Sequence, residues 1–414
     1  MKGIVDDYSS HVNKGWVNTL ENIGSTPPVF QQAEGDLLVD LNGEEWFDFI
    51  GHYGAVIFGH NYPPIIDFTK QLLEKKPISI TPFGISSLPA ELAKVIINRL
   101  GLIGSWNNWS LSTGAEAIES AVKLATFTNG RKKVLARTKG FHGLSKLTLQ
   151  LNDSTFWYEA YDSIVEPGFV DFFSSTSEAI QLLGTKEYSA VIIEPIQAMA
   201  GGVVLDKDEA REIRNACNNT NTLMITDEVF TGMGRSGKYS AMQALEWEIE
   251  PDIIVLSKTL TGGIIPSSQL VVKQELFENF SCQPGYAKLL GSTFSGNNIS
   301  QSIALKVIEL IDDLYDSSDY GLEQSKFHLM LTELNSNFPN KIINVVSYSN
   351  LNFLKFDSPE TAFFIWSELF SNKILTTVCS HQPDTIKLMP SFNQSERSKR
   401  LLCETISVSL EALD

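Results

Sequence analysis

Short apolar runs recur along the chain from about residue 65 to residue 300, and segments with helical periodicity separate several of them. One such segment puts Ala117, Ile118, Ala121, Val122 and Ala125 on one side of a helix. Strands that alternate with helices are typical of an α/β domain with a mainly parallel sheet. The pattern predicts a seven-stranded sheet from the runs at residues 109–111, 134–136, 164–165, 190–193, 223–225, 253–256 and 270–272.

The two ends of the chain have a different pattern. Before residue 50, a short helical lead precedes a hairpin, with turn signals at Gly35-Asp36 and Asn42-Gly43 and strand-like runs after each turn. The segment 51–63 is rich in glycine and aromatic residues and is either a loop that passes close to something or an ordinary packed loop. Near the other end, a long helix at 302–314 precedes mixed strands and helices that include 353–356 and 395–413. We therefore expect a large domain over 56–302 and a smaller α+β domain built from 1–55 and 303–414.

Composition narrows the class of protein. The 414 residues suit two or three domains with a large core, because 43% are hydrophobic and 20% are charged. The net charge is −17 and no Lys/Arg cluster is present, which argues against nucleic-acid binding. Four scattered cysteines without a CxxC pair, and six histidines without ligand spacing, argue against disulfides and metal sites. With no signal-peptide core and no apolar window of about 18 residues, we expect a cytoplasmic protein that does not bind a membrane.

One lysine, Lys258, follows the apolar run 253–256 and precedes the glycine pair Gly262-Gly263. A lysine at a strand end inside a pocket is able to lose its proton and attack a carbonyl carbon. Most lysines at strand ends are instead solvated surface charges, so Lys258 alone does not decide between these interpretations. Ligands of parallel α/β sheets bind outside the carboxyl ends of the strands, and the residues after the other runs therefore bear on the choice.

The first run is followed by a helix start. Thr113 and Glu116 fit a capping box, which is sufficient to explain both residues as structural. Gly114 also permits close approach of the backbone, and free N–H groups at a helix start bind phosphate. Both interpretations remain open from these residues alone.

Acidic and amide residues follow two later runs. Gly232, Gly234 and Gly237 match a dinucleotide fingerprint in form, but they lie several residues past the strand end in a segment typical of an extended loop, so we reject nicotinamide binding. A buried carboxylate at Asp227 needs a cationic partner, and a positively charged ring nitrogen would supply one. Glu194 and Gln197 follow the run 190–193 and are explained equally well as a polar turn.

Six motifs occur together in one order: Thr-Gly-Ala-Glu-Ala at 113–117, Phe-His-Gly at 141–143, Glu-Pro-Ile-Gln at 194–197, Asp-Glu-Val at 227–229, Ser-Lys at 257–258 and Gly-Ser-Thr-Phe-Ser-Gly-Asn at 291–297. In this order and spacing they closely resemble the class III (omega-type) aminotransferases, which are fold-type I enzymes that use pyridoxal 5'-phosphate. The resemblance runs from about residue 28 to residue 390. It implies a catalytic role for Lys258 instead of a surface charge.

The resemblance implies a role for each matching residue. Lys258 would hold the cofactor as a Schiff base and later move a proton, and Asp227 would keep the cofactor's ring nitrogen protonated. Thr293 would reach the phosphate bound by a neighbouring subunit, which implies a homodimer with shared active sites. Tyr53 lies where several members place an aromatic side chain against the substrate. The remaining expected cofactor contacts are Gly114 and Ala115 at the phosphate, Phe141 and Val229 on the two ring faces, Gln197 near the ring hydroxyl, and His142 and Glu194.

Two positions depart from the pattern of members that use glutamate. Those members carry Glu where this chain has Met199, and that Glu pairs with an arginine at the position of Lys387. The loss of one partner favours the loss of the other, because a buried glutamate without its arginine would destabilise the protein. Lysine attracts a carboxylate as a point charge without a bidentate fork, so we expect that glutamate and 2-oxoglutarate are not handled in the usual way. Met199 and Lys387 join Tyr53 as expected substrate-binding residues.

The implied activity is transfer of an amino group between an amine or amino acid and an aldehyde, ketone or keto acid, in a specialised biosynthetic pathway. An aminomutase or amino-acid epimerase on the same scaffold is the alternative, since it also needs Lys258 and Asp227. A non-catalytic regulator that binds the cofactor is a third possibility. The presence of the lysine and the lack of an appended helix-turn-helix domain argue against this third class.

Overall fold

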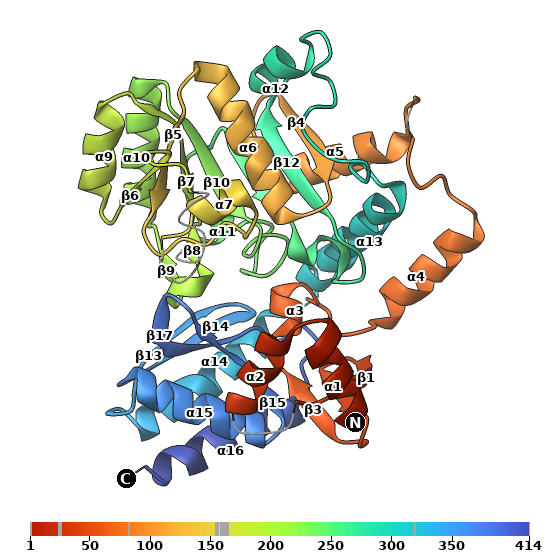
Figure 1. Ribbon diagram of the computed structural model, residues 1–414, viewed down its shortest axis with the longest axis vertical. Coiled ribbons are helices and arrows are strands. Elements are labelled where there is room, and N and C mark those ends of the chain that lie inside the picture. Colours follow the sequence, from red (N-terminus) through yellow and green to blue (C-terminus); the bar gives the residue numbers. More distant parts are fainter. Residues whose placement is uncertain are drawn as a thin grey trace. The chain divides into compact units, whose positions relative to one another are not determined.

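The structure is a computed structural model that describes residues 2–23, 27–81, 83–153, 157, 165–317 and 320–413. The chain divides into two compact units, Met1–Ile66 with Ser317–Asp414, and Asp67–Asp316 (Figure 1). Both chain ends therefore contribute to the first unit, which we call the terminal unit. The second, which we call the sheet unit, comes from one continuous stretch. The boundaries expected from the sequence, after residues 55 and 302, lie before these breaks.

The sheet unit is built on a seven-stranded sheet in the order β4-β12-β11-β10-β7-β5-β6. The strands from β11 to β6 pair in parallel, whereas β12 is antiparallel to both β11 and β4. The predicted mainly parallel α/β sheet is therefore confirmed. Its strands are β4 (Trp106–Leu111), β5 (Lys133–Arg137), β6 (Val170–Phe173), β7 (Tyr188–Ile193), β10 (Leu223–Glu228), β11 (Ile253–Leu256) and β12 (Ser268–Lys273).

One strand was predicted in the wrong place. Ile164 lies outside the described residues and Val165 is in a bend, while the edge strand β6 occupies Val170–Phe173. Asp171 interrupts the apolar pattern of β6, and this hid the strand from a search for apolar runs. At an edge, Asp171 is able to keep polar partners, since its Oδ2 accepts a hydrogen bond of 2.8 Å from the Tyr188 hydroxyl.

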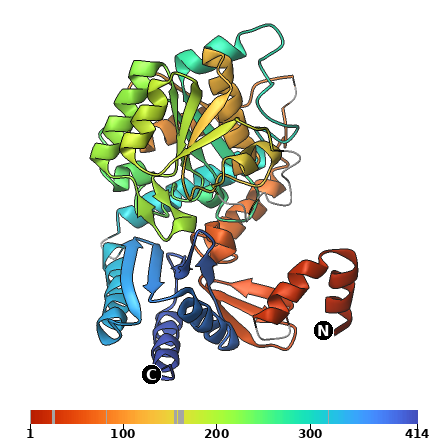
Figure 2. The same ribbon diagram turned by 60° about the vertical axis from the view of Figure 1, so that its left-hand side comes forward.

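Both faces of this sheet are covered. Every residue of β7, β10 and β11 is buried, although successive side chains point to opposite faces. Figure 2 shows helices on the two sides of the sheet. The predicted apolar face of α6 (Gly114–Asn129) is confirmed, because all five of its predicted residues are buried in one cluster with residues of the sheet.

The other helical elements are α4 (Pro63–Glu74), which contains the first break between the units, α5 (Ser87–Arg99), α7 (Lys146–Gln150), α9 (Thr176–Gly184), α10 (Lys207–Thr220), α11 (Ala241–Ala244), α12 (Gln274–Ser281), α13 (Asn298–Tyr315), η2 (Ala198–Ala200) and η3 (Lys258–Thr261).

A two-stranded ribbon in the sheet unit, β8 (Ile196–Gln197) with β9 (Val203–Val204), follows β7. The helix expected at 302–314 is α13, and it belongs to the sheet unit. Among the described residues, no helix combines the length and the apolar character that a membrane span requires.

The terminal unit contains two four-stranded sheets, with the orders β1-β2-β3-β15 and β13-β14-β17-β16. The predicted hairpin is present, since β1, β2 and β3 pair antiparallel around the two expected turns. Its elements are α1 (Lys2–His11), α2 (Lys14–Asn22), β1 (Phe30–Glu34), β2 (Leu37–Asp40), β3 (Glu45–Asp48), α3 (Gly51–Gly54), α14 (Tyr320–Asn337), β13 (Ile342–Tyr348), β14 (Leu351–Phe356), α15 (Pro359–Ser371), β15 (Ile374–Leu375), β16 (Thr377–Cys379), β17 (Gln382–Leu388) and α16 (Glu396–Glu411).

Candidate functional site

The carboxyl ends of strands β4, β7, β10 and β11 lie at one end of the sheet in the sheet unit, and each is followed by a candidate segment (Figure 1). Asp227 is the last residue but one of strand β10, and Glu194 directly follows the end of β7. Lys258 lies two residues after the end of β11, and the start of α6 follows β4. Since these four strands run in the same direction, their carboxyl ends lie at the same end of the sheet, which is where α/β sheets bind ligands.

Lys258 is half-buried and begins the short helix η3. Its φ of 38° falls in the left-handed region, which costs a non-glycine residue about 1 kcal/mol. The preceding Ser257 holds this sharp corner, since its hydroxyl donates a 2.7 Å hydrogen bond to the Ser267 carbonyl oxygen. Lys258 Nζ lies 4.2 Å from the centroid of the Phe230 ring, a cation–π contact. Strained backbone and a held ammonium group distinguish Lys258 from a solvated surface lysine.

Asp227 is only 4% exposed and is bonded on both oxygens. Its Oδ1 accepts the Val229 N–H at 3.0 Å, and its Oδ2 lies 2.8 Å from Nδ1 of the buried His142. Burial alone would lower the pKa of His142, but the hydrogen bond to Asp227 and the charges of Asp227 and Glu194 outweigh it and raise the pKa. The His142 imidazole and the Val229 N–H thus fix the orientation of the Asp227 carboxylate, which is suited to bind a cationic group.

The segment from Thr138 to Gly143 is fixed by residues that follow β7. Glu194 Oε1 accepts the N–H of Phe141 at 2.8 Å, and Gln197 Nε2 donates to the Thr138 carbonyl oxygen at 2.8 Å. Burial, with a smaller effect from the charge of Asp227, raises the pKa of Glu194 to about 7. Glu194 and Gln197 therefore orient the loop that carries Phe141 and His142.

The first turn of α6 touches two of these segments. A Cβ on Gly114 would lie 2.8 Å from Val229 Cγ1, so only glycine permits this approach of helix and loop. On the other side, a Cβ on Gly143 would lie 3.0 Å from the Ala115 Cβ. Gly114, Ala115 and Val229 are thus brought together with the His142 loop.

The start of α6 is capped as predicted, with one difference. Thr113 Oγ1 accepts the Glu116 N–H at 3.2 Å, whereas the Glu116 carboxylate accepts the N–H of Ser112 instead of that of Thr113. The N–H groups of Gly114 and Ala115 lie in the first turn, where a helix has no acceptor for them. They are therefore suited to bind an anionic group such as a phosphate.

Two residues of this site were missed from the sequence. Phe230 lies under the Lys258 ammonium group. Asn152 is fully buried and accepts the His142 N–H at 2.7 Å while its amide donates to the Gly143 carbonyl oxygen at 2.8 Å. Phe230 follows the Asp-Glu-Val motif directly, which was a usable signal, but nothing around Asn152 marks its long-range contacts.

The other expected residues lie outside the contacts described above. Met199 lies in η2, two residues after Gln197, and Thr293 is exposed in the turn that precedes α13. Tyr53 and Lys387 belong to the terminal unit. Lys387 is buried in β17, opposite Phe353 and Thr377 of the neighbouring strands.

The geometry fits a small aromatic group with three polar features. An anionic group suits the α6 start, a protonated ring nitrogen suits Asp227, and a carbonyl carbon suits attack by Lys258. Phe141 and Val229 are partly buried and provide apolar surface beside these groups. Within the described part of the chain, no cluster of three or more His, Cys, Asp or Glu side chains is arranged to hold a metal ion.

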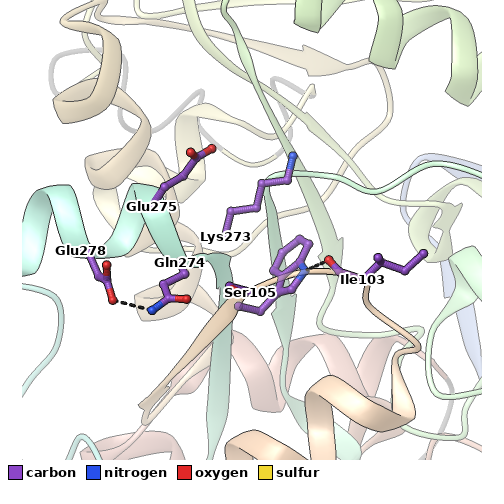
Figure 3. A pocket seen from close by; sticks show the side chains of 7 residues that line it. Ile103, Ser105, Lys273, Gln274, Glu275 and Glu278 are labelled. Carbon is purple, nitrogen blue, oxygen red and sulfur yellow. Dashed lines mark hydrogen bonds between the residues drawn. The ribbon is translucent and has the colours of Figure 1, made fainter.

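The surface pocket shown in Figure 3 lies at the opposite end of the sheet. It has a volume of about 550 Å³ and is lined by residues at the start of β4 and at the junction of β12 and α12. Its Lys273 is paired at 2.8 Å with Asp252, which precedes β11, whereas Lys258 follows β11. The pocket therefore takes no part in the cluster around Lys258.

Glu228, which is buried beside Asp227, gives a pH prediction. Burial first, and then the charge of Asp227, raise its pKa from 4.5 to about 7. The carboxyl group of Glu228 therefore binds its proton more tightly in the folded protein than in the unfolded chain. This proton contributes its full amount to the free energy of unfolding below about pH 4.5, and the contribution is lost as the pH rises through about 7. When the pH falls from about 7.5 to about 5, the free energy of unfolding of the wild type should therefore rise by about 2 kcal/mol more than that of Glu228→Gln. Urea unfolding of the cofactor-free protein at the two pH values measures this difference.

The partly exposed Glu178 provides the control for this measurement, because its pKa is lowered and its substitution by Gln should leave the gain between these pH values unchanged. An equal pH dependence in wild type and Glu228→Gln would contradict the raised pKa of Glu228.

Known proteins resemble this chain in sequence and in fold. A family model described as aminotransferase class III matches residues 21–410, nearly the whole chain. A structure of ornithine aminotransferase from Toxoplasma gondii, described with partial occupancy of PLP at its active site, has a TM-score of 0.82 at 22% identity and covers 99% of this chain and 94% of that chain.

Two further solved structures are similar over their full length. The adenosylmethionine-8-amino-7-oxononanoate aminotransferase from Methanocaldococcus jannaschii has a TM-score of 0.85 at 21% identity, with 99% of each chain covered. An S-selective transaminase from Arthrobacter sp. with alanine bound has a TM-score of 0.85 at 18% identity, covering 100% of this chain and 98% of that chain. These likenesses confirm the expected fold-type I architecture.

Proposed function

The chain belongs to the class III aminotransferase family, whose members use pyridoxal 5'-phosphate, and we propose that the cluster around Lys258 binds this cofactor and transfers the amino group. When bound, the cofactor supplies an electron sink for the substrate carbon that loses a proton. The observation that carries the proposal is the half-buried Lys258 amine above Phe230, at the same sheet edge as the His142–Asp227 pair. A nucleophile and a charged carboxylate at one edge are the two groups that this chemistry needs from the protein.

Lys258 has two tasks in this proposal. Its amine would hold the cofactor covalently at the cofactor's carbonyl carbon, and the same amine, when free, would be the base that moves a proton. Phe230 keeps the ammonium group in place by its cation–π contact. The charge of Lys258 lowers the pKa of Glu194, against the larger effect of burial. This interaction supports the placement of both side chains in one site.

The other residues of the cluster bind and orient. Asp227 would keep the ring nitrogen of the cofactor protonated, and His142 holds Asp227 in place. The N–H groups of Gly114 and Ala115 bind the phosphate. We assign Phe141 and Val229 to the two faces of the ring and Gln197 to the vicinity of its hydroxyl group.

We further propose a homodimer in which Thr293 reaches the phosphate bound by the partner subunit. Support comes from an exposed apolar surface formed by two adjoining segments of the sheet unit. The Asn298 N–H and side-chain amide donate to the carbonyl oxygens of Ser79 and Ile78, which joins these segments. The surface includes Ile78, Phe83, Ile85, Leu289 and Phe294, all more than half exposed. A patch of this kind is typical of a protein interface. Sedimentation of a monomer at micromolar concentration would contradict the dimer.

The substrates are proposed from the departures at Met199 and Lys387. We propose that the enzyme does not use glutamate and 2-oxoglutarate in the usual way and acts on a specialised amino donor or carbonyl compound. Lys387 is 4% exposed in β17, and a buried lysine offers a carboxylate a point charge without the arginine fork. We also propose a cytoplasmic location, which the four free cysteines support and which subcellular fractionation tests.

A panel of amino donors tests these proposals together. We expect the visible absorbance of the enzyme with cofactor to change on addition of at least one of L-alanine, L-ornithine, L-glutamate and 1-phenylethylamine, with glutamate not preferred. Conversion should require an added keto acid or aldehyde. Lys387→Ala should then change kcat/KM for glutamate by less than about 3-fold, because we expect that glutamate does not depend on an ion pair with Lys387.

Two outcomes would contradict parts of this scheme. A saturable preference for glutamate that Lys387→Ala abolishes would mean that Lys387 replaces the arginine. Conversion of a single amino compound without any acceptor would mean that the enzyme is an isomerase.

A further inference from the structure

Residues 51–54 of the terminal unit form a left-handed turn. The φ values of Gly51, His52, Tyr53 and Gly54 are 55°, 50°, 53° and 91°. His52 and Tyr53 each pay about 1 kcal/mol or more for this conformation. Among the described residues, no other two adjacent non-glycine residues both have positive φ.

The strain is not offset by packing of the turn itself. Tyr53 is 63% exposed, so its ring buries little apolar surface within the terminal unit. A strained conformation persists only where the surrounding structure imposes it, and such conformations cluster at functional sites. The surroundings of the turn therefore indicate what imposes it.

A buried Asp48–His60 pair lies behind the turn. Asp48 Oδ1 accepts the N–H groups of Ile50 and Gly51 at 2.7 and 3.0 Å, and Asp48 Oδ2 lies 2.7 Å from His60 Nε2. Both side chains are 6% exposed. The rings of His52 and His60 pack nearly at right angles, with 5.1 Å between their centroids. Asp48 thus fixes the entry to the turn, while His60 fixes Asp48 and packs against His52.

His60 is itself held on both sides by backbone. Its N–H donates to the Gly35 carbonyl oxygen at 2.7 Å, and its carbonyl oxygen accepts the Gly35 N–H at 2.9 Å. A Cβ on Gly59 would lie 2.8 Å from the same Gly35 oxygen, so the two segments approach as closely as glycine allows. The pair therefore rests on a rigid part of the β1–β2 hairpin.

The turn is also joined to the strand that carries Lys387. The Met389 N–H donates to the Phe49 carbonyl oxygen at 2.7 Å, and a Cβ on Gly51 would lie 3.3 Å from the Met389 carbonyl oxygen. Met389 directly follows β17. The turn with Tyr53 and the strand with Lys387 thus belong to one framework within the terminal unit.

We propose that Asp48 and His60 are positioning residues for substrate recognition, which hold the left-handed turn and with it the side chain of Tyr53. This inference rests on the proposed function and on the expected role of Tyr53 in substrate binding. The pair touches no reacting group and acts through Tyr53. A preorganised aromatic side chain loses little conformational freedom on binding, so it favours donors that contact it over donors that do not.

The test compares two donors with the complete enzyme. For the best and second-best donors of the panel, the ratio of their kcat/KM values is independent of the amount of folded enzyme. We expect His60→Ala to change this ratio by about 5-fold or more, and Tyr53→Ala to change it similarly. The double variant should equal Tyr53→Ala alone, because residues that act through one group are not additive. His60→Gln, which keeps a donor near the Nε2 position, should restore the ratio to within about 2-fold.

Asp36→Ala is the matched control. Asp36 is buried in the same unit and accepts hydrogen bonds from Ser395 and Ser398 at the start of α16, so its loss should lower stability and leave the ratio unchanged. If His60→Ala does not fold, Asp48→Asn should shift the ratio in the same direction as Tyr53→Ala.

Three results would overturn the inference: an unchanged ratio in every His60 and Asp48 variant, an equal shift in Asp36→Ala, or independent effects of His60 and Tyr53. A wild-type enzyme that transfers no amino group would instead overturn the proposed function, and this inference with it.

Discussion

Replacement of Lys258 by alanine is expected to lower kcat by about 10⁴-fold or more, because it removes both the nucleophile and the base. The lost amine is the group that lies 4.2 Å from the Phe230 ring centroid. Asp227, His142 and the α6 start remain in this variant, so the cofactor should still bind without a covalent link. Single-turnover absorbance measurements with the best donor follow the loss directly.

Two further lysine variants make this test specific. Lys258→Arg keeps a cation above Phe230 but has no amine that loses its proton at neutral pH, so it should be as inactive as alanine. Lys273 also lies at a strand end of the same sheet, paired with Asp252 at the opposite edge, and Lys273→Ala should keep activity within about 3-fold. Activity in Lys258→Ala within about 10-fold of wild type would exclude Lys258 as the catalytic group.

Much of the sheet unit was predictable because its signals are local. A strand that is buried on both faces is a continuous apolar run, and α6 shows its buried face by a repeat of three and four residues. The residues after each run then had to meet at one edge, because parallel strands end together. The segment after β10 forms turns up to α11, in line with the rejection of a helix start at Gly232–Gly237.

What remained hidden depends on contacts between distant residues. Asn152 is joined to His142 by a contact that no local pattern reveals. The positive φ of Lys258 follows from the corner that Ser257 and Ser267 impose, and lysine has no tendency toward it. The left-handed turn at His52 and Tyr53 was seen only as a loop rich in glycine and aromatic residues, because its cause is the Asp48–His60 pair.

Asp227→Asn is expected to lower kcat by about 10³-fold, which corresponds to about 4 kcal/mol of lost transition-state stabilisation. Asparagine has nearly the same size, so it should still accept the Val229 N–H that Asp227 Oδ1 accepts at 3.0 Å. It carries no charge, however, and therefore does not keep a ring nitrogen protonated. It also leaves the buried His142 without its anionic partner, so the pKa of His142 should fall as burial dominates. The expected signature is a large fall in kcat, measured in single-turnover experiments at full cofactor occupancy.

Asp252 provides the matched control for this prediction. It is as buried as Asp227 and is paired with Arg214 at 2.6 Å, but it precedes β11 and lies at the opposite end of the strand from Lys258. Asp252→Asn should therefore lower the melting temperature while kcat per folded enzyme stays within about 3-fold. If Asp227→Asn instead kept more than about a tenth of the wild-type kcat, the charge of Asp227 would not be what activates the cofactor ring, and Glu194, the other buried carboxylate near Lys258, would be the residue to vary next.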